Sequence, residues 1–144
     1  MSRKRLRILI ATVVVLALIA GVTYGIVLLR CYLDVPVDAY ASDWTAIFVI
    51  EHLKSTDKQW PANWEELRDE FDRMAKPSHY AWSFAQLQQR VDLRFDVVSN
   101  EVRDANPPLE VFRLTSGRRV SYNGNPNLSI REYLRTGKGG METE

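Results

Sequence analysis

Residues 8–29 have the sequence ILIATVVVLALIAGVTYGIVLL, which contains no charged side chain. A helix of these 22 residues is about 33 Å long, and the hydrocarbon core of a bilayer is about 30 Å thick. Lipid offers the backbone no hydrogen-bond partner, so a single stretch that crosses a bilayer has to be helical. The sequence therefore predicts one transmembrane helix over residues 8–29.

Basic side chains flank this stretch unequally. One basic residue, Arg30, follows it directly, whereas four precede it: Arg3, Lys4, Arg5 and Arg7. Because positive residues stay on the cytoplasmic side, we expect residues 1–7 to be cytoplasmic and everything after residue 30 to be extracytoplasmic. A domain without an internal disulfide fits a bacterial inner membrane, with the domain on the periplasmic side.

A cleaved signal peptide also has a basic start and an apolar centre. That centre usually has about 7–15 residues and ends in two small residues separated by one other. The apolar run here is longer, and Leu18 stands where a small residue would be needed before Ala20. A retained signal anchor is therefore favoured. Lipid attachment at Cys31 is disfavoured, because Arg30 directly precedes the cysteine.

Small residues recur every fourth position within the apolar run, at Ala17, Gly21 and Gly25. This spacing lets two membrane helices approach closely, so these residues are a candidate homodimer face. The alternative is that glycine is simply frequent in membrane helices. Cys31, the only cysteine, can bridge two anchors or stay inert, but it cannot form an internal disulfide.

Residues 31–144 suffice for one domain of ordinary size. Five of the 19 basic residues and none of the 18 acidic residues lie in the first 30 positions, which leaves a net charge of −4 on the remainder. The charges are interspersed, and no basic patch with interleaved aromatic residues indicates nucleic-acid binding. We divide the chain into a basic segment 1–7, a transmembrane helix 8–29, a connector 30–38, an extracytoplasmic domain 39–136 and a flexible tail 137–144.

The spacing of apolar residues changes along the outer domain. Period-3.6 spacing with capping residues predicts helices over 38–55, 63–75, 83–89 and 129–136. Period-2 spacing and turn residues predict strands over 91–97, 109–114 and 119–122. The expected fold class is α+β, with a transmembrane helix followed by two to three helices and a short antiparallel sheet.

Residue types that carry chemistry are few. The two histidines, His52 and His79, are isolated in sequence, whereas a zinc site needs three or four ligands. No Gly-x-Ser-x-Gly stretch offers a nucleophile, and no glycine-rich loop before a helix offers a phosphate site. The paired carboxylates at 65–66 and 69–70 are assigned to the solvent face of a helix. We therefore expect no enzyme activity, no cofactor and no metal.

The order of these elements resembles that of pilins and type II secretion pseudopilins. Those proteins have an apolar N-terminal helix that continues outward as an amphipathic helix, then a small antiparallel sheet. They often carry a Tyr-Pro turn before a short leucine-containing helix, to which QWP at 59–61 and WEEL at 64–67 are similar. The processing signature of the family is missing, and Pro36 is expected to interrupt the long helix. No functional residue is therefore transferred from the family.

We expect a non-enzymatic single-pass membrane protein whose outer domain binds other membrane or envelope proteins as an accessory subunit. The first candidates for partner contacts are Trp60, Trp64, Tyr80 and Trp82, with burial in the core as the alternative. Two further functions stay open. One is a pseudopilin-like assembly subunit, and the other is a small membrane-tethered hydrolase that uses His52 or His79 with a carboxylate.

Overall fold

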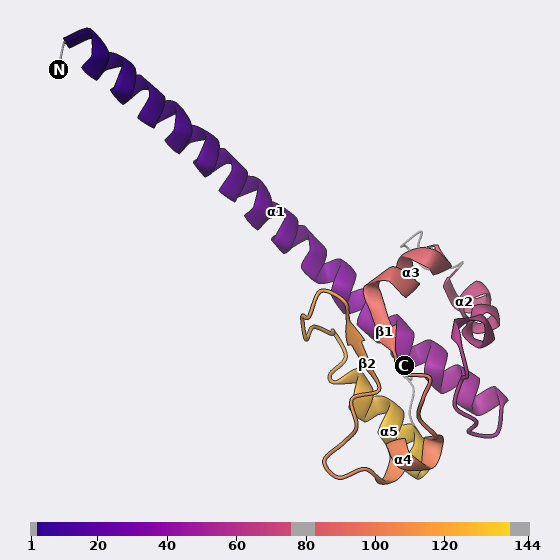
Figure 1. Cartoon of the computed structure of the whole chain (residues 1–144). Coiled ribbons are helices and arrows are strands. Elements are labelled where there is room, and N and C mark those ends of the chain that lie inside the picture. The colour runs from indigo at the N-terminus through magenta and orange to yellow at the C-terminus, as the bar shows by residue number, and fades with distance from the viewer. Residues whose placement is uncertain (1–2, 76–82, 139–144) are drawn as a thin grey trace. The chain divides into compact units, whose positions relative to one another are not determined.

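The computed structural model describes residues 3–75 and 83–138 (Figure 1). The elements in chain order are α1 (Arg3–Ser55), η1 (Trp64–Leu67), α2 (Arg68–Ala75), α3 (Phe84–Arg90), β1 (Val91–Leu93), α4 (Ser99–Asp104), β2 (Phe112–Leu114) and α5 (Pro126–Thr136). The α+β class is confirmed. The expected two to three outer helices are too few, since four α-helices follow α1 within these residues.

Helix α1 continues through Pro36. The expected interruption at Pro36 is therefore wrong, and residues 30–38 are helical instead of an irregular connector. A proline inside a helix removes one hydrogen bond and crowds the carbonyl four residues earlier, at a cost of about 3 kcal/mol. Dense packing of the turns that follow offsets this local cost. The chain divides into two compact units at this proline, Met1–Val35 and Pro36–Glu144.

The first unit contains the apolar part of α1. Its large apolar side chains are exposed around the helix, and none of its most apolar 18-residue window is buried within the structure. Soluble proteins rarely expose a continuous apolar surface of this size to water. By length and composition α1 is a candidate membrane span, the one such helix within the described residues.

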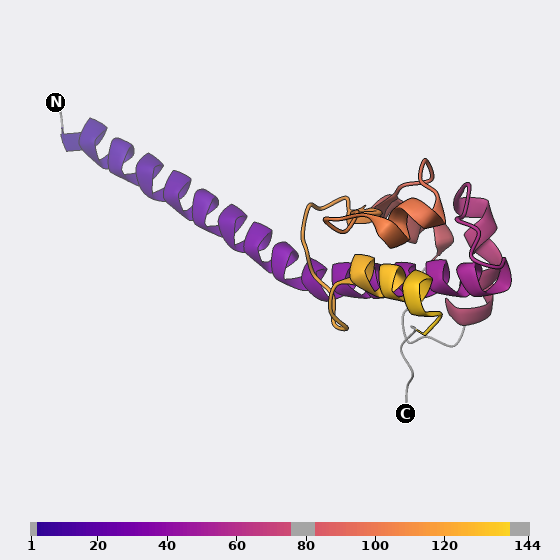
Figure 2. The same cartoon turned by 90° about the horizontal axis from the view of Figure 1, so that it is seen from below.

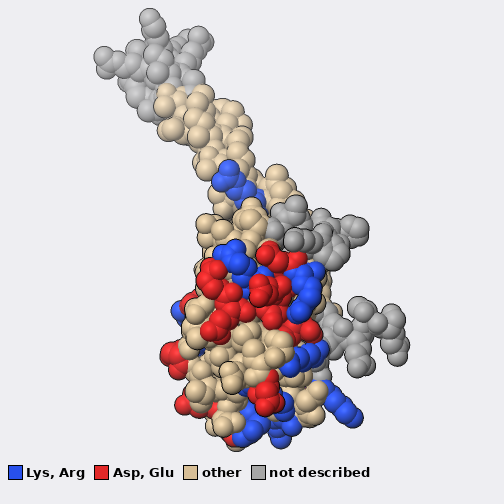
Figure 3. Space-filling view, turned by 90° about the vertical axis from the view of Figure 1, so that its right-hand side faces the viewer, with Lys and Arg blue, Asp and Glu red and all other residues tan. Residues whose placement is uncertain are grey.

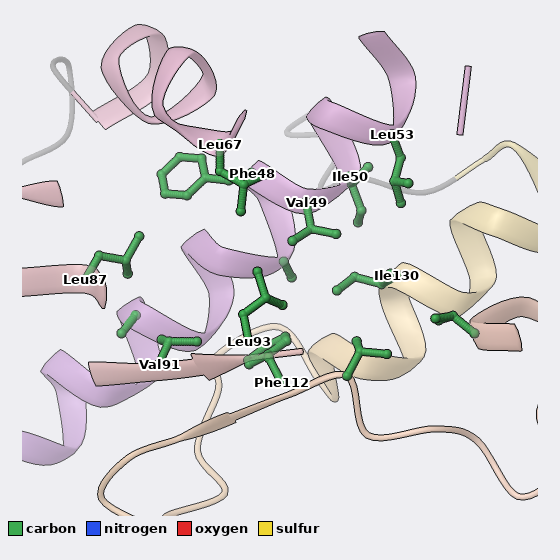
Figure 4. Packing of buried hydrophobic residues seen from close by; sticks show 14 of the residues in the cluster. Phe48, Val49, Ile50, Leu53, Leu67, Leu87, Val91, Leu93, Phe112 and Ile130 are labelled. Carbon is green, nitrogen blue, oxygen red and sulfur yellow. The ribbon is translucent and has the colours of Figure 1, made fainter. Parts of the chain in front are cut away.

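The second half of α1 forms the centre of the second unit, as its dense apolar spacing predicts. Buried side chains of α1 pack against residues from η1, α3 and α5 (Figure 4). The fully buried members of this core include Phe48, Val49, Leu53, Leu67, Leu87 and Ile130. Figures 1 and 2 show α5 and the two strands flanking this part of α1.

The two strands form an antiparallel pair in which Val91 faces Leu114 and Leu93 faces Phe112. All four of these side chains are buried, and the residues between them are exposed. The alternation of apolar and polar residues predicted this arrangement. The predicted strands 91–97 and 109–114 contain the observed ones but extend too far, and helix α4 between them was not predicted.

Residues 119–122 form no strand, so the third predicted strand is wrong. Asp43 of α1 binds the polar groups of this segment instead. Its Oδ2 accepts from the Tyr122 N–H (3.0 Å) and from Asn123 Nδ2 (3.2 Å), and its Oδ1 accepts from the Ser121 hydroxyl. A buried carboxylate on the central helix thus takes the place of a neighbouring strand.

The helix starts predicted from capping residues were partly correct. Asn63 caps η1 and Ser83 caps α3 with a capping box, as their spacing to Glu66 and Gln86 predicts. The predicted start of the last helix at Ser129 is wrong, because α5 begins at Pro126 with Asn125 as its cap. Proline fits the first helical position, where its missing N–H leaves no hydrogen bond unmade.

Leu53 provides a test of the central packing. Leu53→Ala should lower the free energy of unfolding by about 2–5 kcal/mol, because Leu53 has no exposed surface and the substitution leaves a cavity. Leu128→Ala is the matched control. Leu128 is 45% exposed, so its truncation should change stability by about 0.5 kcal/mol. Urea unfolding of the full chain in detergent micelles, followed by tryptophan fluorescence, measures both. Equal losses would contradict a core centred on α1.

Candidate functional site

The predicted homodimer residues lie in the apolar part of α1. Ala17, Gly21 and Gly25 are exposed, and a Cβ added at either glycine would meet no heavy atom within 4 Å. Cys31 is exposed as well. Pairing of two helices through this face stays a prediction.

The predicted aromatic contacts divide into two groups. Trp60 is partly buried and its Nε1 donates to the Arg94 carbonyl at 2.8 Å. Trp64 is also partly buried, with its ring edge-on to Phe84 and Phe95 at centroid distances of 6.0 and 5.8 Å. Both side chains pack against the core, and a role in partner contact stays a prediction. Tyr80, Trp82 and His79 lie outside the described residues.

A cavity of about 490 Å³ lies beside the C-terminal turns of α1. Its titratable lining comes from His52 on α1, Glu66 on η1, and Asp69 and Glu70 on α2. Trp60 contributes an aromatic side chain to the lining. The cavity therefore brings three carboxylates, an imidazole and an indole together, although Glu70 follows His52 by 18 positions in sequence.

Glu70 is the unusual member of this group. It is only 5% exposed, so its assignment to the solvent face of α2 is wrong. Its Oε1 accepts from the Ser55 hydroxyl at 3.3 Å, whereas its buried Oε2 has no hydrogen-bond partner among residues 3–75 and 83–138. Burying an unpartnered polar atom costs about 1–3 kcal/mol, and more for a charged group. Native proteins contain few such atoms, and each calls for an explanation.

The sequence contained a signal for this burial. Glu70 is three residues after Leu67 and four before Met74, and side chains at these spacings share one face of a helix. Leu67 is buried and Met74 packs against the core, so Glu70 has to enter the same face. The number of neighbouring acids, at 65, 66, 69 and 72, hid that signal.

The geometry around His52 gives little support to a hydrolase. His52 Nε2 lies 3.8 Å from Glu66 Oε2, which is beyond hydrogen-bond distance, and that oxygen accepts from the Ala62 N–H at 2.9 Å. Among the described residues, no lining hydroxyl donates to the His52 ring: Thr56 Oγ1 donates to the His52 carbonyl (2.7 Å), and Ser55 Oγ donates to that carbonyl (3.0 Å) and to Glu70 Oε1 (3.3 Å). Activation of a hydroxyl by His52 requires its contact with the imidazole. Across residues 3–75 and 83–138, no group of three His, Cys, Asp or Glu side chains is placed to hold a metal ion.

Two described basic side chains near the cavity, Arg68 and Lys54, are engaged outside it. Arg68 binds Glu65 through Nε (2.6 Å) and Nη2 (2.9 Å) and lies 4.6 Å from the Phe84 ring centroid. This pairing lowers the pKa of Glu65 and raises the pKa of Arg68, chiefly through the side-chain hydrogen bonds. Lys54 binds Glu51 at 2.6 Å. Figure 3 shows acidic side chains gathered over one face of the folded unit, with basic ones beside them.

A second cluster of charge lies on α1 at Asp38. Asp38 is 2% exposed and accepts from Arg90 Nη1 (2.9 Å), Arg118 Nη1 (2.8 Å) and Ser116 Oγ (2.7 Å). Asp38 does not cap a helix, because it lies inside α1, which starts 35 residues earlier. Asp38 instead joins the central helix to the end of α3 and to the loop after β2, which is a structural role.

A cavity of about 590 Å³ also lies along β2 and the segment before α5. Its arginines pair within the fold: Arg118 with Asp38 at 2.8 Å, Arg113 with Asp92 at 2.9 Å and, more weakly, Arg119 with Glu110 at 3.7 Å. Internal pairing of this kind leaves less charge for a ligand, so we place the candidate site at the His52–Glu70 cavity.

No protein-family model matches the chain, and comparisons with curated proteins and with solved structures find no similar protein. A function for this protein therefore rests on the chemistry of its own residues.

Asp38 gives a test of the structural cluster. Asp38→Ala should lower the free energy of unfolding by about 2–3 kcal/mol, because three donors lose a buried carboxylate. Asp92→Ala is the matched control, since it breaks an exposed ion pair with Arg113 and should cost under about 1 kcal/mol. Urea unfolding of the full chain in micelles measures both losses. Equal losses would mean that Asp38 does not fasten these segments.

Glu65 gives a pH-dependent test. Its folded-state pKa is lowered, so its ion pair with Arg68 stabilises the fold above the ordinary value of 4.5 and ceases to do so as the pH falls through the folded pKa. The stability difference between the wild type and Glu65→Gln should shrink on acidification below pH 4.5, and should also shrink in 0.5 M salt at neutral pH because the pair is exposed. Thermal unfolding across this pH range measures it. A difference that grows on acidification would contradict the assignment.

Proposed function

We propose that this protein is a single-pass membrane protein whose extracytoplasmic domain binds other envelope proteins, as an accessory subunit without catalytic activity. The observation that carries the proposal is helix α1. Its first part exposes apolar side chains around the helix, and its last turns form the core of a folded unit. Lipid stabilises the first part of such a helix by covering its apolar side chains, and protein stabilises the last part in the same way.

Charge supports the proposed orientation. Four basic residues precede the apolar stretch and one follows it, which favours a cytoplasmic N-terminus. The remainder of the chain carries a net charge of −4 and is not drawn electrostatically to anionic lipid or nucleic acid. Both features favour a domain that is held near the membrane and meets other proteins there.

An assembly subunit similar to a pseudopilin is the second candidate. The continuity of α1 through Pro36 favours it, because the resemblance implies an apolar helix that continues into the domain. The small antiparallel sheet fits the same layout. The family's processing signature is missing from the sequence, so we place this candidate after the accessory subunit.

Photo-cross-linking in intact membranes tests the proposal. A photoreactive residue replaces one exposed position at a time, on different faces of the domain: Gln59, Ala85, Asn100 and Leu128. The accessory-subunit proposal expects one or two positions to capture the same other envelope protein, while the remaining positions serve as controls. A ladder of self-cross-links would replace it with the assembly subunit. Absence of cross-links at every position would contradict both.

Self-association through α1 gives a separate prediction. Gly21→Ile and Gly25→Ile should reduce oxidative cross-linking through Cys31 severalfold, because bulky side chains separate two helices packed at this face. Thr23→Ile is the control, since residue 23 is rotated by about 200° from Gly21. Copper-catalysed oxidation of membranes, followed by non-reducing gels, measures the dimer. Equal cross-linking in all three variants would exclude this face.

A further inference from the structure

We propose that the cavity lined by His52, Trp60, Glu66, Asp69 and Glu70 binds an alkylammonium group. This inference rests on the proposed function, from which we assign the group to a lysine side chain of a partner protein. The ligand class follows from four features of the cavity: an unpartnered buried oxygen, the sign of its charge, an aromatic wall and the engagement of nearby lysines.

The first feature is Glu70 Oε2. It is buried without a hydrogen-bond partner within the described residues, while Oε1 accepts from Ser55. A donor supplied by a ligand would remove this unfavourable state, and a charged N–H donor gives the strongest hydrogen bond to a carboxylate. Only one oxygen of Glu70 lacks a partner, so the fork of an arginine cannot bind it bidentately. The compact ammonium group of a lysine needs one oxygen from each acceptor.

The second feature is the charge of the lining. Among the described residues, three carboxylates and no lysine or arginine line the cavity, so the cavity favours a cation over an anion. A metal ion would need a set of close ligands, which the described residues do not offer. An ammonium group requires only acceptors within hydrogen-bond distance, and Glu66, Asp69 and Glu70 supply them.

The third feature is Trp60. Its indole Nε1 donates to the Arg94 carbonyl at 2.8 Å, which holds the ring in place at the cavity. A lysine side chain has an apolar stem and a charged head, and the stem packs on apolar surface while the head stays polar. A tryptophan face also attracts an ammonium group directly. The cavity volume of about 490 Å³ falls in the usual range for small-ligand sites, about 300–1,000 Å³.

The fourth feature is that two lysines among the described residues near the cavity, Lys54 and Lys58, are engaged elsewhere. Lys54 binds Glu51 at 2.6 Å, and Lys58 Nζ lies 3.4 Å from the Leu134 carbonyl. Neither of these two described lysines occupies the cavity, so its carboxylates can accept a lysine from another molecule.

Titration of the full chain in zwitterionic lipid nanodiscs tests the ligand class. The chain has four tryptophans, and Trp60→Phe identifies the indole signal of Trp60 in a nitrogen-15 spectrum. At constant ionic strength, n-butylammonium should shift this signal saturably with a millimolar dissociation constant, whereas neutral n-butanol should not. No saturable shift, or an equal shift with n-butanol, would overturn the proposal.

Three variants locate the site. Glu70→Met should weaken butylammonium binding at least tenfold, and Asp69→Asn should weaken it severalfold. Glu132→Gln, which removes an exposed carboxylate on α5, should leave the affinity within twofold. The unfolding temperature separates recognition from folding, because Glu70→Met removes an unpartnered buried oxygen and should not lower it. Unchanged affinity in Glu70→Met would overturn the proposal.

Zero-length carbodiimide coupling in native membranes identifies the source of the ammonium group. The expected product is an amide bond between Asp69 or Glu66 and a lysine of another protein, lost in Asp69→Asn and retained in Glu132→Gln. Coupling to a free polyamine at these carboxylates would overturn the assignment to a partner protein while keeping the ligand class. The titration needs no partner, so its failure leaves the photo-cross-linking test of the proposed function unaffected.

Discussion

One helix has to satisfy two different surroundings, and the rest of the structure depends on that constraint. The first part of α1 exposes apolar side chains around its circumference, which suits lipid. Its last turns mix apolar with polar side chains, and their apolar side chains are covered by protein because they belong to the folded unit. The segments after Ser55 are short, and their buried apolar side chains belong to the same core as those of α1. A small two-stranded sheet suffices because α1, and not the sheet, provides the centre of the core.

Buried acids on α1 determine where the later segments attach. Asp38 gathers Arg90, Ser116 and Arg118, and Asp43 binds the backbone and side chains of residues 121–123. Each carboxylate is stable in the interior because several donors reach it. Glu70 differs from both, since one of its oxygens lacks any donor within the described residues. Hydrogen-bond donors satisfy the buried carboxylates of Asp38 and Asp43. The oxygen of Glu70 that lacks a donor therefore calls for a functional explanation.

Patterns that depend on neighbours in sequence were the predictable part of this chain. The apolar run, the alternation in β1 and β2, and the caps at Asn63 and Ser83 all involve residues within a few positions of one another. The errors concern distant partners. The strand predicted at 119–122 failed because Asp43, about 80 residues away, binds its polar groups. Pro36 stays helical because of packing further along α1. In the cavity, the burial of Glu70 is the one feature that the local sequence pattern indicates.

The central claim is that residues 8–29 anchor the chain with its folded unit outside the cytoplasm. Labelling of single cysteines with a membrane-impermeant maleimide tests it most directly, in a Cys31→Ser background that removes the only native cysteine. Ala85→Cys, at an exposed position of α3, should be labelled in intact cells, and Ser2→Cys only after the membrane is opened. The full-length protein should remain in the membrane fraction. Protection of residue 85 until lysis, or release of a shortened protein from the membrane, would contradict the account.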